Sequence, residues 1–240
     1  AQIPRQRVDG WSLTVVALCG FLLGPVIALL ITAFGDSGGL WAHLASTVLG
    51  KYVGNTLILM MGVGALAILF GVSSAWVITR YEFTGRVWFE WMLLLPAAIP
   101  AYIIAYTYTD FFEYAGPVQT ALRGFFGWQS ARDYWFPEIR SLGGATLVMA
   151  SVLYPYIYMV TRIAFRLTSA SLFEIALVHN KSQFWTVGLP LARPAIMAGL
   201  ALVLMEVVSD FGTVEYFAIE TITLGIFNVW LGMNLSLIHI

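Results

Sequence analysis

The sequence predicts an all-α, polytopic membrane protein, with a bundle of about five transmembrane helices and a C-terminal re-entrant or interfacial segment. Two observations indicate this fold class. The 240 residues are 60% hydrophobic and only 10% charged, whereas a soluble domain carries about 25% charged residues. Several apolar stretches are also long enough to cross a hydrocarbon core of about 30 Å, which requires about 20 helical residues.

Five stretches are predicted to cross the membrane. The first, second and fourth contain no charged residue, the third has Glu90 at its edge, and the fifth holds Glu206 and Asp210. The apolar core of a cleaved signal peptide would be only about 7–15 residues long, so the first stretch is interpreted as an uncleaved span. The five stretches are residues 11–34, 52–79, 87–109, 142–161 and 193–217.

The segments between the spans divide the chain further. Residues 1–51 form an N-terminal segment that contains the first transmembrane helix and a Gly-rich outer loop, and residues 52–240 contain the other spans. Residues 110–140 form a long polar connection rich in aromatic residues, which suit a membrane–water interface. Residues 221–240 are interrupted by glycines and are expected to be re-entrant or interfacial rather than a full span.

The distribution of Lys and Arg predicts the orientation in the membrane. With a cytoplasmic N-terminus, eight of the 12 basic residues lie inside and four outside, which is the bias seen in membrane proteins. The inside set is Arg5, Arg7, Arg80, Arg86, Arg162, Arg166, Lys181 and Arg193, and the outside set is Lys51, Arg123, Arg132 and Arg140. The loop of residues 162–194 is therefore expected to be cytoplasmic.

Composition and motifs exclude several functions. The net charge of −1 gives no indication of nucleic-acid binding, and the lone Cys19 provides neither a disulfide framework nor a thiolate metal site. There is no phosphate-binding loop and no H-E-x-x-H motif. The chain is not expected to be an enzyme, and no catalytic or metal-binding residue is predicted.

Four residues inside the spans are candidates for a translocation path. Pro96 and Pro100 interrupt the third span, which indicates either simple packing geometry or a bent helix lining a path. Glu206 and Asp210 are four residues apart and share a helix face. They could form a proton relay of a secondary carrier, or be carboxylates held by hydrogen bonds inside the bundle.

The loop of residues 162–194 is the most informative stretch. Leu172, Ile175 and Ala176 could form one short amphipathic helix, and Leu189-Pro190 precedes the next apolar run. A loop with its own helix between two spans either contacts a partner or is simply solvated, and composition alone does not decide between these.

Several motifs resemble one transporter family. Glu174, Ile175 and Ala176, followed by Leu189-Pro190, resemble the EAA loop of type I (MetI-like) ABC-transporter permeases. The Asp210-Phe211-Gly212-Thr213 stretch and residues 114–123 resemble the iron(III) branch of that family. The likeness extends over residues 105–128, 136–165, 190–217 and 222–230.

The resemblance implies a permease subunit of an ATP-driven importer in the cytoplasmic (inner) membrane, with ferric iron as its cargo. Thiamine, polyamine, sulfate and molybdate importers share this architecture and remain alternatives. Residues 52–240 would then be a type-1 permease domain truncated before its last span. The implied partners are cytoplasmic ATPase subunits that bind ATP, a periplasmic substrate-binding protein, a second permease half or protomer, and the lipid bilayer. No cofactor is expected in this chain.

The resemblance also names the residues expected to couple the chain to its ATPase: Glu174, Ala176, Lys181, Leu189 and Pro190. The sequence departs from the family here. The spacing from Glu174 to Pro190 is shorter, Asn180 stands near a family glycine, and Ile175 replaces an alanine. These differences predict a coupling helix that is shortened or that begins differently.

Overall fold

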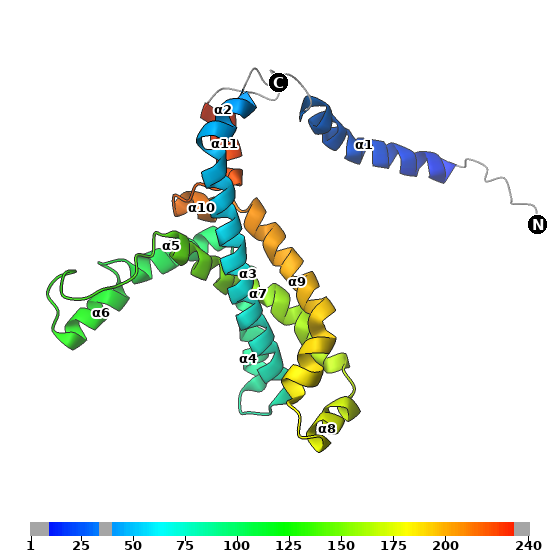
Figure 1. Cartoon of the computed structure of the whole chain (residues 1–240), viewed down its shortest axis with the longest axis vertical. Helices are drawn as coiled ribbons and strands as arrows, with labels where there is room; N and C mark the ends of the chain where they lie inside the picture. The colour runs from blue at the N-terminus through cyan, green and yellow to red at the C-terminus, as the bar shows by residue number, and fades with distance from the viewer. Residues whose placement is uncertain (1–9, 34–39, 233–240) are drawn as a thin grey trace, which may run out of the picture. The chain divides into compact units, whose positions relative to one another are not determined.

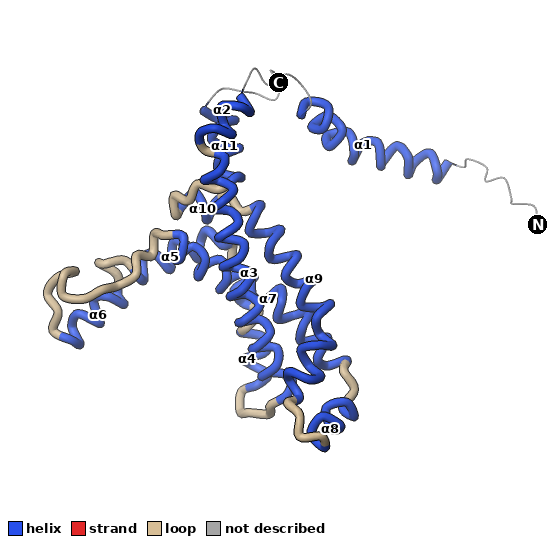
Figure 2. The backbone as a smooth tube through the Cα atoms, in the orientation of Figure 1, coloured by secondary structure: helices blue, strands red, loops and turns tan. Residues whose placement is uncertain are grey.

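The computed structural model describes residues 10–33 and 40–232. In this part of the chain every regular element is a helix, and Figure 2 shows helices joined by loops with no strand. The elements, labelled in Figure 1, are α1 (Gly10–Ala33), α2 (Leu40–Thr47), α3 (Leu49–Arg80), α4 (Arg86–Met92), the 3-10 helix η1 (Leu95–Ala98), α5 (Ala101–Phe112), α6 (Pro117–Phe126), α7 (Leu142–Leu167), α8 (Ala170–Val178), the π-helix η2 (Phe184–Gly188), α9 (Leu189–Ser209), α10 (Gly212–Tyr216) and α11 (Ile222–Gly232).

The chain divides into two compact units. One contains α1, α2 and the last residues of α11, and the other runs from Val48 to Asn228. Helix α1 is apolar, and its described side chains are exposed. An apolar helix exposed in this way is expected to face lipid.

Helices α3, α7 and α9 form the core of the larger unit. Ile157 of α7 lies between glycines of the two other helices: a Cβ on Gly71 of α3 would lie 2.9 Å from Ile157 Cβ, and one on Gly199 of α9 would lie 2.9 Å from Ile157 Cα. Small residues allow membrane helices to pack this closely. The buried side chains of these three helices include Leu59, Val63, Ala67, Val148, Met149, Leu153, Ile196 and Val203.

The predicted third span, interrupted by Pro96 and Pro100, is sharply broken. The segment is broken into α4, η1 and α5, and the stretches on either side of the break are bent by 102°. Proline has no backbone N–H and disfavours a helical conformation in the residue before it. Accordingly Ile99, which precedes Pro100, is extended, with φ −111° and ψ 127°.

The fifth span also differs from its prediction. Helical backbone begins at Phe184 rather than at residue 193, and α9 ends at Ser209, before the short helix α10. Among the described residues, four helices are long and apolar enough to cross a membrane, or five if the bent pair counts as one span. The fold class and the prediction of about five spans are confirmed.

The connections contain more helix than expected. Helix α2 lies in the predicted Gly-rich loop, and α6 lies in the long connection of residues 110–140. The predicted fourth span continues to Leu167. Helix α11 forms the described part of the C-terminal segment, while Arg5, Arg7, most of the Gly-rich turn and residues 233–240 lie outside the described residues.

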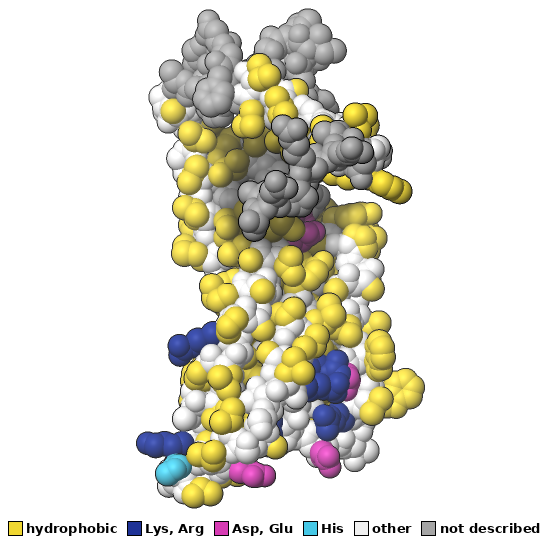
Figure 3. All heavy atoms as spheres, turned by 90° about the vertical axis from the view of Figure 1, so that its right-hand side faces the viewer, with side chains coloured by type: hydrophobic (Ala, Val, Ile, Leu, Met, Phe, Trp, Pro, Cys, Tyr) yellow, Lys and Arg dark blue, Asp and Glu magenta, His cyan; other side chains and the backbone are white. Residues whose placement is uncertain are grey.

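Charged side chains are unevenly distributed on the face shown in Figure 3. Hydrophobic side chains cover much of that face, and most of the charged side chains visible there lie in its lower half. Figure 1, which shares the vertical axis, has α8 at the lower end. A charged end next to apolar sides is expected of a helical bundle in a membrane.

Candidate coupling site and translocation path

Helix α8 ends in a defined hydrogen-bonded cap. The backbone N–H of Lys181 donates to Ala176 O (2.8 Å), and that of Asn180 donates to Leu177 O (2.9 Å). Asn180 has a positive φ of 52°. This is the Schellman arrangement, in which glycine is usual and asparagine is tolerated at the left-handed position. Asn180 therefore performs the structural role for which a glycine is normally used.

The two faces of α8 differ in burial. Phe173 and Ala176 are buried, whereas Leu172 and Ile175 are 41% and 54% exposed. A helix forms at the expected place, but it is not amphipathic as predicted, because Leu172 and Ile175 lie on its exposed face. Glu174, Leu177 and Val178 are also exposed. The outer surface of α8 is mainly apolar with one carboxylate.

An aromatic cluster holds the buried face of α8 against the bundle. Trp76 of α3 contacts the rings of Phe165 of α7, Phe173 of α8 and Phe184 of η2, with ring centroids 5.3, 6.0 and 5.0 Å away. A Cβ on Gly188 would lie 2.5 Å from Trp76 Cζ3, so only glycine fits there. One tryptophan of α3 thus contacts α7, α8 and η2.

Arg80 and Gln183 add polar contacts to this cluster. The Arg80 guanidinium lies 4.1 Å from the centre of the Phe173 ring and donates to Gln183 Oε1 at 3.1 Å. Gln183 Nε2 in turn donates to Phe173 O at 3.1 Å. Cation–π contacts and charge-assisted hydrogen bonds are among the stronger polar interactions of side chains. We call Trp76, Arg80, Phe173, Phe184 and Gln183 the α8 latch.

The structure places the predicted coupling residues in three positions. Glu174 and Lys181 are exposed at α8, Ala176 is buried in the contact with Val187, and Leu189 and Pro190 form the half-buried first turn of α9. Only residues 179–183 separate α8 from the π-helix that leads into α9. The connection between α8 and η2 is therefore short.

The latch residues are the ones that sequence reasoning missed. Trp76 and Arg80 lie on α3, far from the loop in sequence, and nothing in their local pattern indicates a contact with α8. Phe173 and Gln183 lie inside the loop, but their role depends on Arg80. Helical periodicity could have predicted the buried face of α8, because Phe173 and Ala176 are three residues apart and share a face.

The predicted path residues fall into two groups. Pro96 lies in η1 and Pro100 at the start of α5, so both belong to the bend in the broken span. The Asp210 carboxylate caps α10: it accepts from Thr213 N (2.7 Å) and from Thr213 Oγ1 (2.9 Å). Glu206 is exposed on α9, and no described residue forms a hydrogen bond or an ion pair with its carboxylate.

This geometry does not bring Glu206 and Asp210 together as a relay. Asp210 is used as a helix cap, and no hydrogen bond joins the two side chains in the described structure. Among the described residues, no three His, Cys, Asp or Glu residues lie in an arrangement that could hold a metal ion.

Known proteins similar to this chain are permease proteins of several transport systems. An Fe(3+)-transport system permease protein, FbpB 2 of Haemophilus influenzae, is 26% identical over 182 residues, which cover 75% of this chain and 31% of that protein. The sulfate permease protein CysT of Synechococcus elongatus is 29% identical over 208 residues, 85% of this chain and 72% of the relative. No protein-family model matches the chain.

The chain is therefore similar to permease proteins of ion-transport systems. The molybdenum permease protein ModB of Escherichia coli adds a third kind of relative, with 26% identity over 65% of this chain and 68% of ModB. Such permeases are not enzymes themselves, in agreement with the prediction from the sequence. The chain spans about a third of the Haemophilus protein, and similar identities to iron, sulfate and molybdenum systems leave its substrate unassigned.

Proposed function

We propose that this permease carries a small inorganic ion across the cytoplasmic membrane in an importer driven by a separate ATPase. A periplasmic binding protein delivers the ion to the outer side, and a second permease half or protomer completes the pathway. The ATPase binds ATP and acts on α8. The N-terminus and α8 are cytoplasmic in this proposal, and no nucleic acid takes part.

The observation that supports coupling through α8 is its combination of a firmly held inner face and an exposed apolar outer face. Leu172, Ile175, Leu177 and Val178 are large apolar side chains open to a partner. The latch and the aromatic contacts of Trp76 connect α8 to α3, α7 and η2. A movement imposed on α8 is therefore expected to reach the spanning helices, because packed elements move as units.

We propose ferric iron as the cargo. Sulfate and molybdate are the main alternatives, and thiamine and polyamine are weaker ones. The support for iron is the match to the Haemophilus permease and the resemblance of residues 114–123 and 210–213. Acidic residues outnumber basic ones at the predicted outer end, which is compatible with a cation, although Lys51 pairs with Glu220 and Arg140 pairs with Glu113, each at 2.7 Å.

The test of coupling uses charge reversal at Glu174. In proteoliposomes with the complete transporter, Glu174→Arg should lower ATP-driven uptake at least tenfold, because an opposite charge at a docking surface is strongly unfavourable. Glu138→Arg is the matched control, since Glu138 is an exposed carboxylate in the connection of residues 110–140. Wild-type uptake by the Glu174→Arg protein, at equal membrane insertion, would refute the coupling role.

A second measurement distinguishes the alternative carrier. A proton-coupled carrier predicts that the purified permease moves its substrate under a pH gradient without any ATPase, and that Glu206→Gln abolishes this movement. The present proposal predicts no uptake without the ATPase. The cargo is identified in the same vesicles by competition among radiolabelled ferric iron, sulfate and molybdate, each presented with its binding protein.

A further inference from the structure

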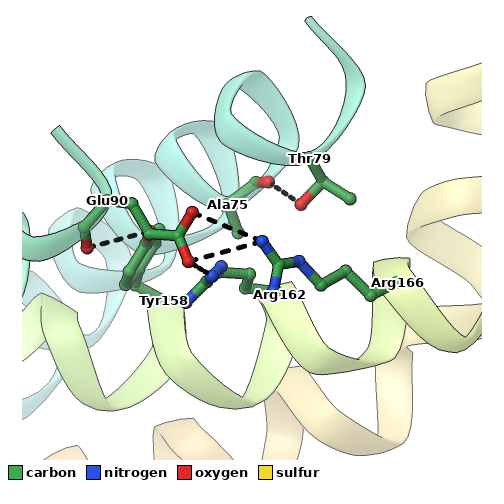
Figure 4. Close-up of polar contacts among 6 residues, drawn as sticks. All are labelled: Ala75, Thr79, Glu90, Tyr158, Arg162 and Arg166. Carbon is green, nitrogen blue, oxygen red and sulfur yellow. Dashed lines mark hydrogen bonds and ion pairs between the residues drawn. The ribbon is translucent and has the colours of Figure 1, made fainter. Parts of the chain in front are cut away.

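A compact charged cluster joins α4 to the end of α7. Figure 4 shows the Glu90 carboxylate of α4 facing Arg162 and Arg166 of α7. Glu90 pairs with Arg162 and, at 3.3 Å, with Arg166, and the Tyr158 hydroxyl donates to Glu90 O at 3.4 Å. These contacts hold α4 against the end of α7 that leads into α8.

The cluster contains more positive than negative charge. Arg86, the first residue of α4, is four residues before Glu90, so the two share one face of the helix. Two arginines contact the Glu90 carboxylate and a third lies on its helix face, so the net charge of the group is +2. If Glu82 of the preceding turn is counted, the balance is still positive. We call Arg86, Arg162 and Arg166 the arginine cluster.

The guanidinium of Arg166 has N–H donors that form no hydrogen bond to the described part of the protein. The Arg166 side chain is 48% exposed, and both of its hydrogen bonds to Glu90 come from one nitrogen, Nη2. A guanidinium has five N–H donors arranged as a planar fork that fits a carboxylate or phosphate. Within the described residues, Nη1 and Nε of Arg166 donate no hydrogen bond to a protein acceptor.

The surface of α4 next to the cluster is suited to a membrane interface. None of the residues of α4 is buried, and Val87, Trp88, Trp91 and Met92 are between 54% and 76% exposed. Exposed tryptophans next to basic residues on a short helix are typical of the boundary between headgroups and acyl chains.

We infer that the arginine cluster and the exposed aromatic face of α4 bind the headgroup of an anionic phospholipid, in the leaflet on the α8 side of the membrane. Arg166 and Arg86 contact the phosphate, and Trp88 and Trp91 lie among the upper acyl carbons. Glu90 holds the two helices in position and lowers the net charge of the site. The occupant is a lipid rather than a free anion, because the apolar face of α4 would otherwise be exposed to water.

Native mass spectrometry of the full chain tests this inference. The protein is equilibrated in detergent with equal amounts of phosphatidylglycerol and phosphatidylcholine of identical acyl chains. Wild-type protein should retain phosphatidylglycerol preferentially. Arg166→Gln and Arg86→Gln should each lower that preference about fivefold, as expected for one basic residue at an anionic membrane surface. Arg132→Gln, which removes the same charge from the connection of residues 110–140, should not change it.

Two further measurements keep the inference falsifiable. Glu90→Gln, checked for folding by size-exclusion chromatography, should raise the preference for phosphatidylglycerol, whereas a purely structural cluster predicts no increase. Inorganic phosphate at millimolar concentration should not displace the lipid. Equal retention of the two lipids by the wild type, an equal loss in Arg132→Gln, or displacement by phosphate would overturn the proposal.

Discussion

Asn180 shows how a single residue determines where α8 ends. Its φ of 52° lies in the left-handed region, which most residues with a Cβ avoid. The cap bonds of Asn180 and Lys181 to Leu177 and Ala176 require this conformation. Asparagine, which tolerates this conformation, therefore allows the turn that follows the helix.

The conformation of Asn180 gives a prediction at the residue scale. Asn180→Gly should leave stability unchanged or slightly raised, because glycine adopts this φ readily. Asn180→Val should cost about 1–2 kcal/mol, because its branched side chain is strained there. His179→Val is the control, since His179 has a φ of −86°. Thermal denaturation in lipid nanodiscs measures the difference, and equal midpoints for the two valine variants would contradict it.

Close packing decides the arrangement of the elements α3, α7 and α9. Gly71 and Gly199 both face Ile157, and neither position has room for a Cβ without movement of α7. Packed interiors relax only partly when atoms are added, so overpacking is destabilising. The glycine content of the second span alone does not distinguish these positions from Gly54, whose Cβ position is open.

Alanine substitutions test this packing. Gly199→Ala should destabilise the bundle by about 1–3 kcal/mol, because the new methyl group overlaps Ile157 and Val160. Gly54→Ala should be neutral or stabilising, because alanine is the better helix former. Residual folded fraction after heating in detergent is the measurement, and a Gly199→Ala protein as stable as Gly54→Ala would disagree with the structure.

The α8 latch gives a second prediction for an element. Arg80→Gln removes the guanidinium from the Phe173 ring and weakens its bond to Gln183, so α8 should open more easily by about 2 kcal/mol. Hydrogen exchange of the α8 amides should accelerate, while the amides in the middle of α3 keep their protection. Arg193→Gln serves as the control, since Arg193 is an exposed arginine of α9. Unchanged exchange in α8 would show that Arg80 does not hold it.

At the scale of the whole molecule, the arrangement of helices requires opposite ends of the larger unit to face opposite sides of the membrane. Helix α7 is long enough to span, with the 127–141 loop before it and α8 after it. The charge bias of the sequence predicts that the α8 side is cytoplasmic.

Labelling of single cysteines tests this orientation. In a Cys19→Ser background, Gln129→Cys should react with a membrane-impermeant maleimide from the outside of intact spheroplasts. Lys181→Cys should react only in inverted vesicles. Both positions are exposed in the structure, so each is accessible from its own side. The reverse pattern would invert the proposed topology and remove α8 from the reach of a cytoplasmic ATPase.

The sequence by itself determined the class of protein and the positions of most spans. Length and polarity of a stretch are local properties, and the bilayer imposes a common requirement on every span, so α1, α3 and α7 were predicted within a few residues apart from the extended end of α7. The prolines in the third span predicted an interruption of the helix, but they did not predict a bend of 102°.

Only the tertiary structure decided which residues act together. The latch joins Arg80 to Gln183, the Asp210 carboxylate caps α10, and the cluster joins Glu90 to Arg162 and Arg166. The latch and the cluster join residues distant in sequence, and the cap depends on where α9 ends. The periodicity of residues along one helix does not predict such contacts, because they form only when one helix packs against another.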